Sequence, residues 1–326
     1  MLAPLLAALL LSSTPDAAPQ TRPPQAAPAI PSADSPTDLE DVVVEGRRLD
    51  EQVSTFVREV GQPARGRGLA RWHDSVCVQA VNLRTETAQY LVDRVSTVAQ
   101  DVGLRAGEPG CHPNIFVIAT TDADAFSRRF VERRRILFTL GGAGTDLGRS
   151  ALERFMNNDR PVRWWNVSMP IDEDTGQWAT RLPGDASVNV SSEIYNPLLS
   201  APSIMVNSSR LSTEIRDDSK RIFVIVDADK VSGVSVEQLG DYVAMVSLAQ
   251  INPEADTSGY ATVLNLFADP ERTSGLTNWD KAYLQGLYTV QRTRRNPSSA
   301  RTEVAASIIR AHHTLTAAQD QQGDPE

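Results

Sequence analysis

The chain has 326 residues, of which 41% are hydrophobic and 22% are charged. This composition is sufficient for a folded core and too polar for a protein embedded in a membrane. The formal net charge is −9 at pH 7, which argues against nucleic-acid binding, because that function normally requires a basic face. The length would allow two domains, but the composition of about the first 70 residues indicates that they do not fold.

The sequence begins MLAPLLAALLL, an apolar run that is too short to span a bilayer and suits the core of a signal peptide. Small and polar residues follow, as expected near a cleavage site. The run departs from the usual pattern because no Lys or Arg precedes it. We predict a signal peptide over 1–18 and a periplasmic or secreted protein; the alternative is a disordered apolar N-terminus on a cytosolic protein. No other stretch approaches transmembrane length.

Residues 19–70 are rich in Pro, Ala, Ser and Thr in their first part, and we predict a disordered arm. Within it, the segment EDVVVEGRR at 40–48 is similar to the TonB box of outer-membrane transporters. Such a segment could pair with the sheet edge of a partner; the alternative is an ordinary first strand or a linker. Residues 51–60 are predicted to form a short helix.

From residue 71 the pattern becomes globular, and we place one domain over 71–295. Its opening elements are a strand at 76–81, a helix at 86–102 and a strand at 115–119, an order that predicts a βαβ unit. A helix to about 133 and another at 149–157 follow. Further strands are predicted at 162–169, 177–182, 186–190, 204–206 and 221–226.

The last third of the sequence is predicted to be helical. Ser235 with Gln238, and Thr277 with Asp280, have the spacing of residues that cap a helix N-terminus. The predicted helical segments are 235–250, 260–267, 277–288 and 302–317. We treat 296–326 as a peripheral helix with a polar tail. The expected fold class is α/β to α+β, as a single globular domain with a mixed sheet and a helical C-terminal third.

Two cysteines, Cys77 and Cys111, lie within the predicted domain. In an oxidising compartment they predict one disulfide. With His73 and His112 they also have the composition of a Cys₂His₂ zinc site. The spacing is poor for zinc, because the adjacent Cys111 and His112 can seldom both bind one ion. We therefore favour the disulfide and predict no metal site and no cofactor.

The sequence contains none of the hydrolase motifs GxSxG, HExxH and SxxK. His73, Asp74 and His112 form a candidate polar site, from which a Ser/His/Asp set could be assembled. Nothing in the sequence selects one serine over another. An ordinary surface role for these residues is the alternative.

A cluster of arginines forms the candidate anion site, because Arg side chains bind phosphates and carboxylates. The alternative is a solvated helix face. The cluster consists of Arg128, Arg129, Arg133, Arg134 and Arg135. The glycine-rich segment 141–146 that follows lacks the Lys of a phosphate-binding P-loop, so we expect a flexible loop.

Two further groups of residues have ligand-type chemistry. Asp227 and Asp229 follow a predicted strand, where carboxylates often hold a cation, although a cap or turn role is more common. Trp164 and Trp165 could form the floor of a ligand groove, although core packing is the default role of tryptophan.

Three segments have a distinctive layout: QLGDYVAMVSLAQ at 238–250, NLF at 265–267 and LTNWDKAYLQGLY at 276–288. Residues 220–290 resemble secreted zincin metalloproteases, in which a long helix with two histidines and a glutamate precedes a helix beginning LT-x-x-D. Here Met245, Val246 and Ala249 stand in the positions of the zinc ligands and base. None of them can bind zinc or transfer a proton, so the resemblance implies a zincin-like fold in a pseudoenzyme.

The globular part as a whole also resembles a family of proteins exported by Gram-negative bacteria, which implies no activity. We expect a non-catalytic envelope protein that binds a protein, peptide or glycan, without nucleic acid and without an integral membrane span. One alternative is a hydrolase of unknown substrate, with a site near His73 and Asp74 or near the arginine cluster. Another is a cytosolic zinc protein that uses Cys77 and Cys111.

Overall fold

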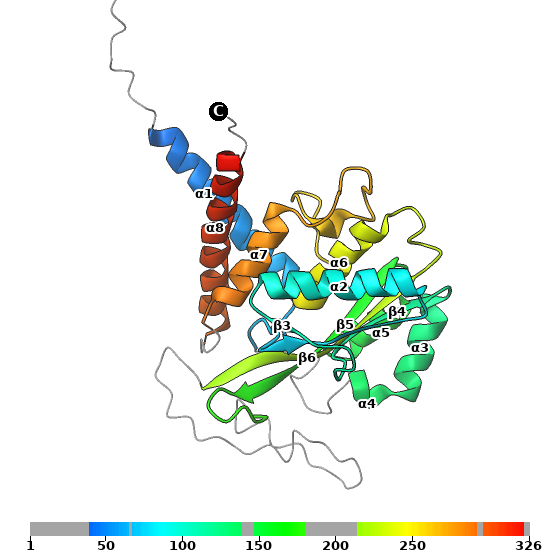
Figure 1. The fold of residues 1–326 in the computed structure, drawn as a ribbon. Helices are drawn as coiled ribbons and strands as arrows, with labels where there is room; N and C mark the ends of the chain where they lie inside the picture. The colour runs from blue at the N-terminus through cyan, green and yellow to red at the C-terminus, as the bar shows by residue number, and fades with distance from the viewer. Residues whose placement is uncertain (1–38, 65–66, 139–146, 180–213, 292–295, 323–326) are drawn as a thin grey trace, which may run out of the picture. The chain divides into compact units, whose positions relative to one another are not determined.

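The structure is a computed structural model of the chain (Figure 1). The residues that it describes are 39–64, 67–138, 147–179, 214–291 and 296–322. Several predicted features lie outside them: the signal peptide over 1–18, the glycine-rich segment 141–146, and the strands at 186–190 and 204–206.

The described residues form a four-stranded sheet with the strand order β2-β4-β6-β5. Three strands, β2 (Val78–Val81), β4 (Ile115–Thr120) and β6 (Ile215–Asp227), run parallel. The edge strand β5 (Val162–Asp172) is antiparallel to β6. The chain is therefore mixed α/β with a mixed sheet, as the sequence predicts.

Helices follow the strands for most of the chain. In chain order they are α1 (Leu39–Val60), α2 (Thr85–Asp101), α3 (Ala123–Arg133), α4 (Arg135–Phe138), α5 (Arg149–Asn157), α6 (Val236–Leu248), the 3₁₀ turn η1 (Val263–Asn265), α7 (Asn278–Thr289) and α8 (Pro297–Gln322). Because α2 connects the parallel strands β2 and β4, the predicted βαβ opening is confirmed. A second, two-stranded parallel sheet pairs β1 (Ser75–Val76) with β3 (Arg105–Ala106).

The side chains of β6 enter two separate hydrophobic clusters, because successive residues of a strand point to opposite faces. Ile222 and Val224 belong to the larger cluster, which contains residues of α1, α2, α6, α7 and α8. Phe223 and Ile225 belong to the smaller one, with residues of α3, α4 and α5. The sheet is thus covered by helices on both faces (Figure 1).

Helix α6 begins with the predicted capping box. The Ser235 hydroxyl accepts a hydrogen bond from the Gln238 backbone N–H, and the Gln238 side chain accepts one from the Ser235 N–H. A second capping box, between Thr277 and Asp280, begins α7. These reciprocal bonds satisfy backbone donors that have no partner within the helix, so both predicted helix starts are confirmed.

The N-terminal boundary of the predicted domain is wrong. Helix α1 covers residues 39–60, so the segment 40–48 is helical and not extended. Val53, Phe56, Val57 and Val60 are fully or almost fully buried. Their spacing of i, i+3, i+4 and i+7 places them on one helix face, and this face is part of the larger cluster. The folded part therefore begins well before residue 71.

The C-terminal boundary at 295 is also wrong, although the predicted helix is present as α8. Val304, Ala305 and Ile308 are buried in the larger cluster, so α8 is part of the core and not peripheral. Its approach to α7 is close, because a Cβ atom at Gly286 would lie 2.7 Å from the Ile308 backbone nitrogen. No helix within the described ranges combines the length and the apolar character that crossing a membrane requires.

Candidate functional site

The predicted disulfide is present. Cys77, between β1 and β2, is bonded to Cys111 in the loop between β3 and β4. The bond closes the covalent ring that contains α2. Both thiol groups of the alternative zinc site are used in this bond.

The structure does not bring the candidate polar residues into a buried site. His73, Asp74 and His112 are all exposed. The Asp74 carboxylate forms an ion pair with Arg105, whose side chain is 73% exposed. Solvent screens such a pair, so this contact contributes little to holding the three side chains together.

The arginine cluster extends from the middle of α3 to the start of α4. All five side chains are exposed. Arg128 donates a hydrogen bond to the Asn157 side chain of α5 at 3.2 Å. The glycine-rich segment that was expected near the cluster lies outside the described residues, so the anion site stays a prediction.

The candidate cation site after β6 already faces a cation of the protein. The Lys230 ammonium lies 3.7 Å from the carboxylate of Asp227 and also pairs with Asp159. A nearby lysine disfavours a metal ion at this carboxylate. Within the described residues, no group of three or more Asp, Glu, His or Cys side chains has the arrangement of a metal site.

The two adjacent tryptophans of β5 pack on opposite faces of the sheet. The Trp164 indole N–H donates to the backbone carbonyl of Ile251 at 2.9 Å, and the Trp165 indole N–H donates to that of Phe138, also at 2.9 Å. Tyr242 of α6 packs against Trp164, and burial raises the pKa of its hydroxyl. These contacts hold β5 between two sets of helices.

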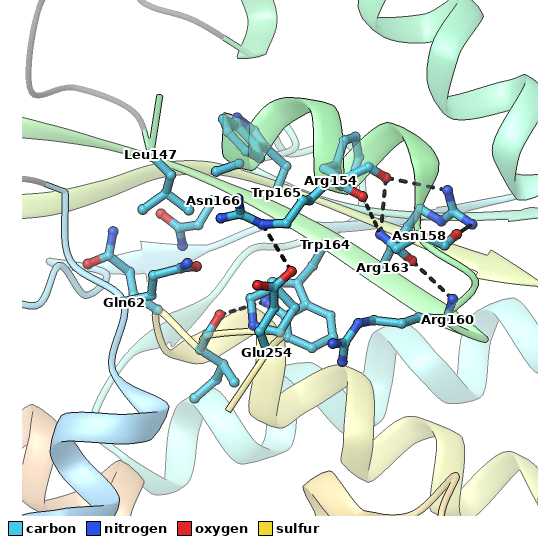
Figure 2. A pocket seen from close by; sticks show the side chains of 15 residues that line it. Gln62, Leu147, Arg154, Asn158, Arg160, Arg163, Trp164, Trp165, Asn166 and Glu254 are labelled. Atoms are coloured by element: carbon cyan, nitrogen blue, oxygen red, sulfur yellow. Dashed lines mark hydrogen bonds and ion pairs between the residues drawn. The ribbon is translucent and has the colours of Figure 1, made fainter. Parts of the chain in front are cut away.

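A pocket lies beside β5 (Figure 2). Trp164 and Trp165, named in the sequence analysis as a possible groove floor, are among its lining residues, whereas its other residues were not predicted. One wall comes from α5 and the residues next to it, and the other from the segment after α6. The residues of the two walls are Ala151, Arg154, Phe155 and Asn158 on one side, and Gln250, Ile251, Pro253 and Glu254 on the other. Between them the pocket reaches Trp164, Trp165 and Asn166 of β5.

The outer edge of β5 faces away from the rest of the sheet. The Asp227 backbone N–H donates to the Pro161 carbonyl at 2.8 Å. Because backbone groups of an antiparallel strand point alternately to its two sides, this bond fixes the pattern along β5. Val162, Trp164 and Asn166 therefore direct their backbone N–H and C=O groups away from β6. The described residues place no further strand beside this stretch. All eleven residues of β5 are nevertheless buried, with Val162 1%, Trp164 6% and Asn166 7% exposed.

The side chain of Asn166 is the most unusual group in the pocket. It is 7% exposed, and neither its Oδ1 nor its Nδ2 has a hydrogen-bond partner within the described parts of the chain. Leaving a buried polar group unsatisfied costs about 1–3 kcal/mol. An unsatisfied buried amide in a native protein requires an explanation. One explanation is that this amide binds a group of a ligand.

Arg163 fixes the wall that α5 provides. Its side chain is 1% exposed, and its guanidinium donates to the carbonyls of Met156 at 3.2 Å and Asn158 at 2.7 Å. These groups lie at the end of α5, where carbonyls have no intrahelical partner. The same guanidinium pairs with Asp124 of α3 at 2.6 Å, so this wall is firmly attached to β5.

The opposite wall is held by backbone contacts with the segment after α1. The Gln62 backbone N–H donates to the Gln250 carbonyl at 3.0 Å. The side-chain Oε1 of Gln250 accepts a bond from the Ala70 backbone N–H at 2.7 Å. This wall is therefore built from two segments that are distant in the sequence.

An ion pair joins the two walls. Arg154 of α5 and Glu254 lie 3.0 Å apart, and their side chains are 51% and 47% exposed. Figure 2 shows this pair in front of β5. Exposed pairs contribute about 0–1 kcal/mol, so this contact can open at little cost. Glu254 is the one carboxylate among the described residues that line the pocket.

The zincin-like positions are inaccessible. Met245 and Val246 are 0% exposed and Ala249 is 1% exposed.

Comparison of the chain with protein-family models, curated proteins and solved structures found no match.

Proposed function

We propose that this protein is a non-catalytic exported protein that binds an extended peptide segment by strand addition at the outer edge of β5. The observation that carries the proposal is the set of outward-directed backbone groups of Val162, Trp164 and Asn166, beside a pocket. Because these three residues are at most 7% exposed, binding requires the two walls of the pocket to separate, as the weak contact between Arg154 and Glu254 allows. Extended peptides add to such an edge through their own N–H and C=O groups, while pockets alongside select side chains.

The same edge favours a peptide over a glycan as the partner. Donors and acceptors alternate along β5, and a second polypeptide backbone repeats this alternation with the same period. The lining of the pocket supports binding in preference to hydrolysis, because its carboxylate, Glu254, is ion-paired with Arg154.

The pseudoenzyme interpretation belongs to this proposal. It rests on the resemblance of residues 220–290 to zincin metalloproteases, in which Met245, Val246 and Ala249 would stand where the zinc ligands and the base are expected. Export is supported by the disulfide, because such bonds persist mainly in oxidising compartments.

Hydrogen exchange tests strand addition directly. The probe is a nonapeptide of alternating Thr and Val, added at about millimolar concentration to detect even weak binding. We expect the amides of Val162, Trp164 and Asn166 to gain protection. Those of Arg163 and Trp165 serve as internal controls, because they point toward β6 and are protected already.

A proline-rich nonapeptide of the same length is the matched control, since it lacks the backbone donors that strand addition needs. It should leave all five amides unchanged. Binding of the Thr/Val peptide without new protection at alternate residues would rule out strand addition, and so would the absence of binding.

A further inference from the structure

The position of Asn166 on β5 determines what it would meet in a bound strand. Residues two apart on a strand share a face, so the side chain of Asn166 lies on the same face as Trp164. In a pair of strands, directly opposed side chains have their Cβ atoms about 4.5–5.5 Å apart. A residue of the added strand opposite Asn166 would therefore be its immediate neighbour.

From the two unpartnered atoms of this amide, we infer that the pocket selects a primary carboxamide side chain, Asn or Gln, at that position of the peptide. The inference rests on the proposed strand addition. The Asn166 side chain offers a donor and an acceptor together, and both lack partners among the described residues. Only a group with an acceptor and a donor side by side satisfies both, as another carboxamide does.

Charged side chains fit this position less well. An ionised carboxylate has no donor for Asn166 Oδ1, and an ammonium has no acceptor for Nδ2. Two neighbouring polar groups are already engaged, because Gln250 Oε1 is bonded to the Ala70 N–H and Arg154 is paired with Glu254. A carboxylate of the peptide would therefore have to compete with Glu254 for Arg154. A buried ion without a partner is strongly disfavoured, so the pocket discriminates against Asp, Glu and Lys.

The free volume of the pocket limits the size of the peptide side-chain group that can lie against Asn166. It is about 30 Å³, which is room for one or two water molecules. A terminal carboxamide is of similar size and can replace the hydrogen bonds of such a water. A ring or a branched hydrocarbon cannot replace them.

The test compares nonapeptides of alternating Thr and Val that carry Gln, Glu or Met at the centre, measured by fluorescence anisotropy. For the unmodified protein we expect the Gln peptide to bind about tenfold to a hundredfold more tightly than the Met or Glu peptide. In Asn166→Leu this preference should be lost, and the Met peptide should bind at least as well as Gln. Thermal unfolding verifies that the variant is folded.

A second variant, Asn166→Asp, keeps the size of the side chain and removes its donor. It should lose the preference for Gln. It should also bind a further nonapeptide, with Lys at the centre, more tightly than the unmodified protein does. Equal affinities of the unmodified protein for Gln, Glu and Met would overturn the carboxamide inference and leave strand addition intact.

A measurement on the side chain itself separates the two proposals if no peptide binds. In protein labelled with ¹⁵N at asparagine, the Asn166 NH₂ signal is identified by its absence in Asn166→Leu. We expect N-acetylglutamine amide to shift this signal and N-acetylglutamate not to shift it. If neither compound shifts it, the amide is satisfied by a resident water and the inference is wrong.

Discussion

The guanidinium of Arg163 holds the end of α5 against the edge strand. It reaches from β5 to the carbonyls of Phe155 and Asn158 and to the carboxylate of Asp124. The planar fork of arginine can serve several acceptors at once. One residue thus terminates a helix and fixes a wall of the candidate site.

Replacing Arg163 by Met should lower the free energy of unfolding by about 3 kcal/mol, because the terminal carbonyls and Asp124 lose their charged donor. Urea denaturation measures the change. The control is Arg160→Met, since Arg160 is half-buried and has no ion pair within the described residues. That variant should change stability by less than about 0.5 kcal/mol. Similar losses in both variants would contradict the role of Arg163.

Asn166 directly follows the two tryptophans, in a strand that also contains the polar residues Arg163, Ser168 and Asp172, so its polarity alone does not distinguish it. Its significance depends on burial without a partner, which arises only when α5 and residues 250–254 come together. His73 and Asp74 were predicted as a polar site from their residue types, but the structure leaves both exposed. Residue type indicates possible chemistry and does not indicate burial.

At the scale of elements, α7 and α8 are packed unusually closely at Gly286. A Cβ atom built there would lie 2.5 Å from Ile308 Cγ1 and 2.8 Å from its Cα. The second of these atoms is backbone, so a change of side-chain rotamer cannot relieve the contact. The whole of α8 would have to move.

Gly286→Ala should therefore destabilise the protein by about 1–3 kcal/mol, the usual cost of overpacking. This cost should exceed the gain that alanine normally brings inside a helix. Gly233→Ala is the control, because a Cβ atom at that position would meet nothing within 4 Å. Thermal unfolding of the two variants makes the comparison. An unchanged midpoint for Gly286→Ala would show that the two helices can separate freely.

Elements with a local signal were predicted well, and elements that depend on distant partners were not. The capping boxes at Ser235 and Thr277 and the periodic apolar face of α2 are complete within short stretches of sequence. Helix α1 was limited to residues 51–60 and assigned to a disordered arm. Its apolar face becomes part of a core only when the C-terminal helices are in place.

At the scale of the whole molecule, the disulfide is the one covalent link between distant parts of the described chain. It could be predicted because the sequence has only two cysteines. The layered arrangement of helices on both sides of a mixed sheet could be predicted only as a class. The strand order and the antiparallel edge strand β5 depend on long-range pairing that leaves little trace in local sequence.

Replacing both Cys77 and Cys111 by Ala should lower the free energy of unfolding by about 3–4 kcal/mol, because the 34-residue separation makes the unfolded chain much less restricted. Chemical denaturation of the two proteins gives this difference. A reductant should weaken the unmodified protein to a similar extent and leave the double variant unchanged. A reductant effect on the double variant would show that the loss does not come from this bond.

The ring of Phe56 has a further consequence for how the chain acquires its structure. It packs edge-on against Tyr260, Trp279 and Tyr283. The first buried aromatic residue of the described sequence therefore has its aromatic partners more than 200 positions later in the chain. Proteins are synthesised from the N-terminus, and contacts so distant in sequence slow folding. The core therefore cannot close during most of translation, and the nascent chain stays open until α7 has emerged.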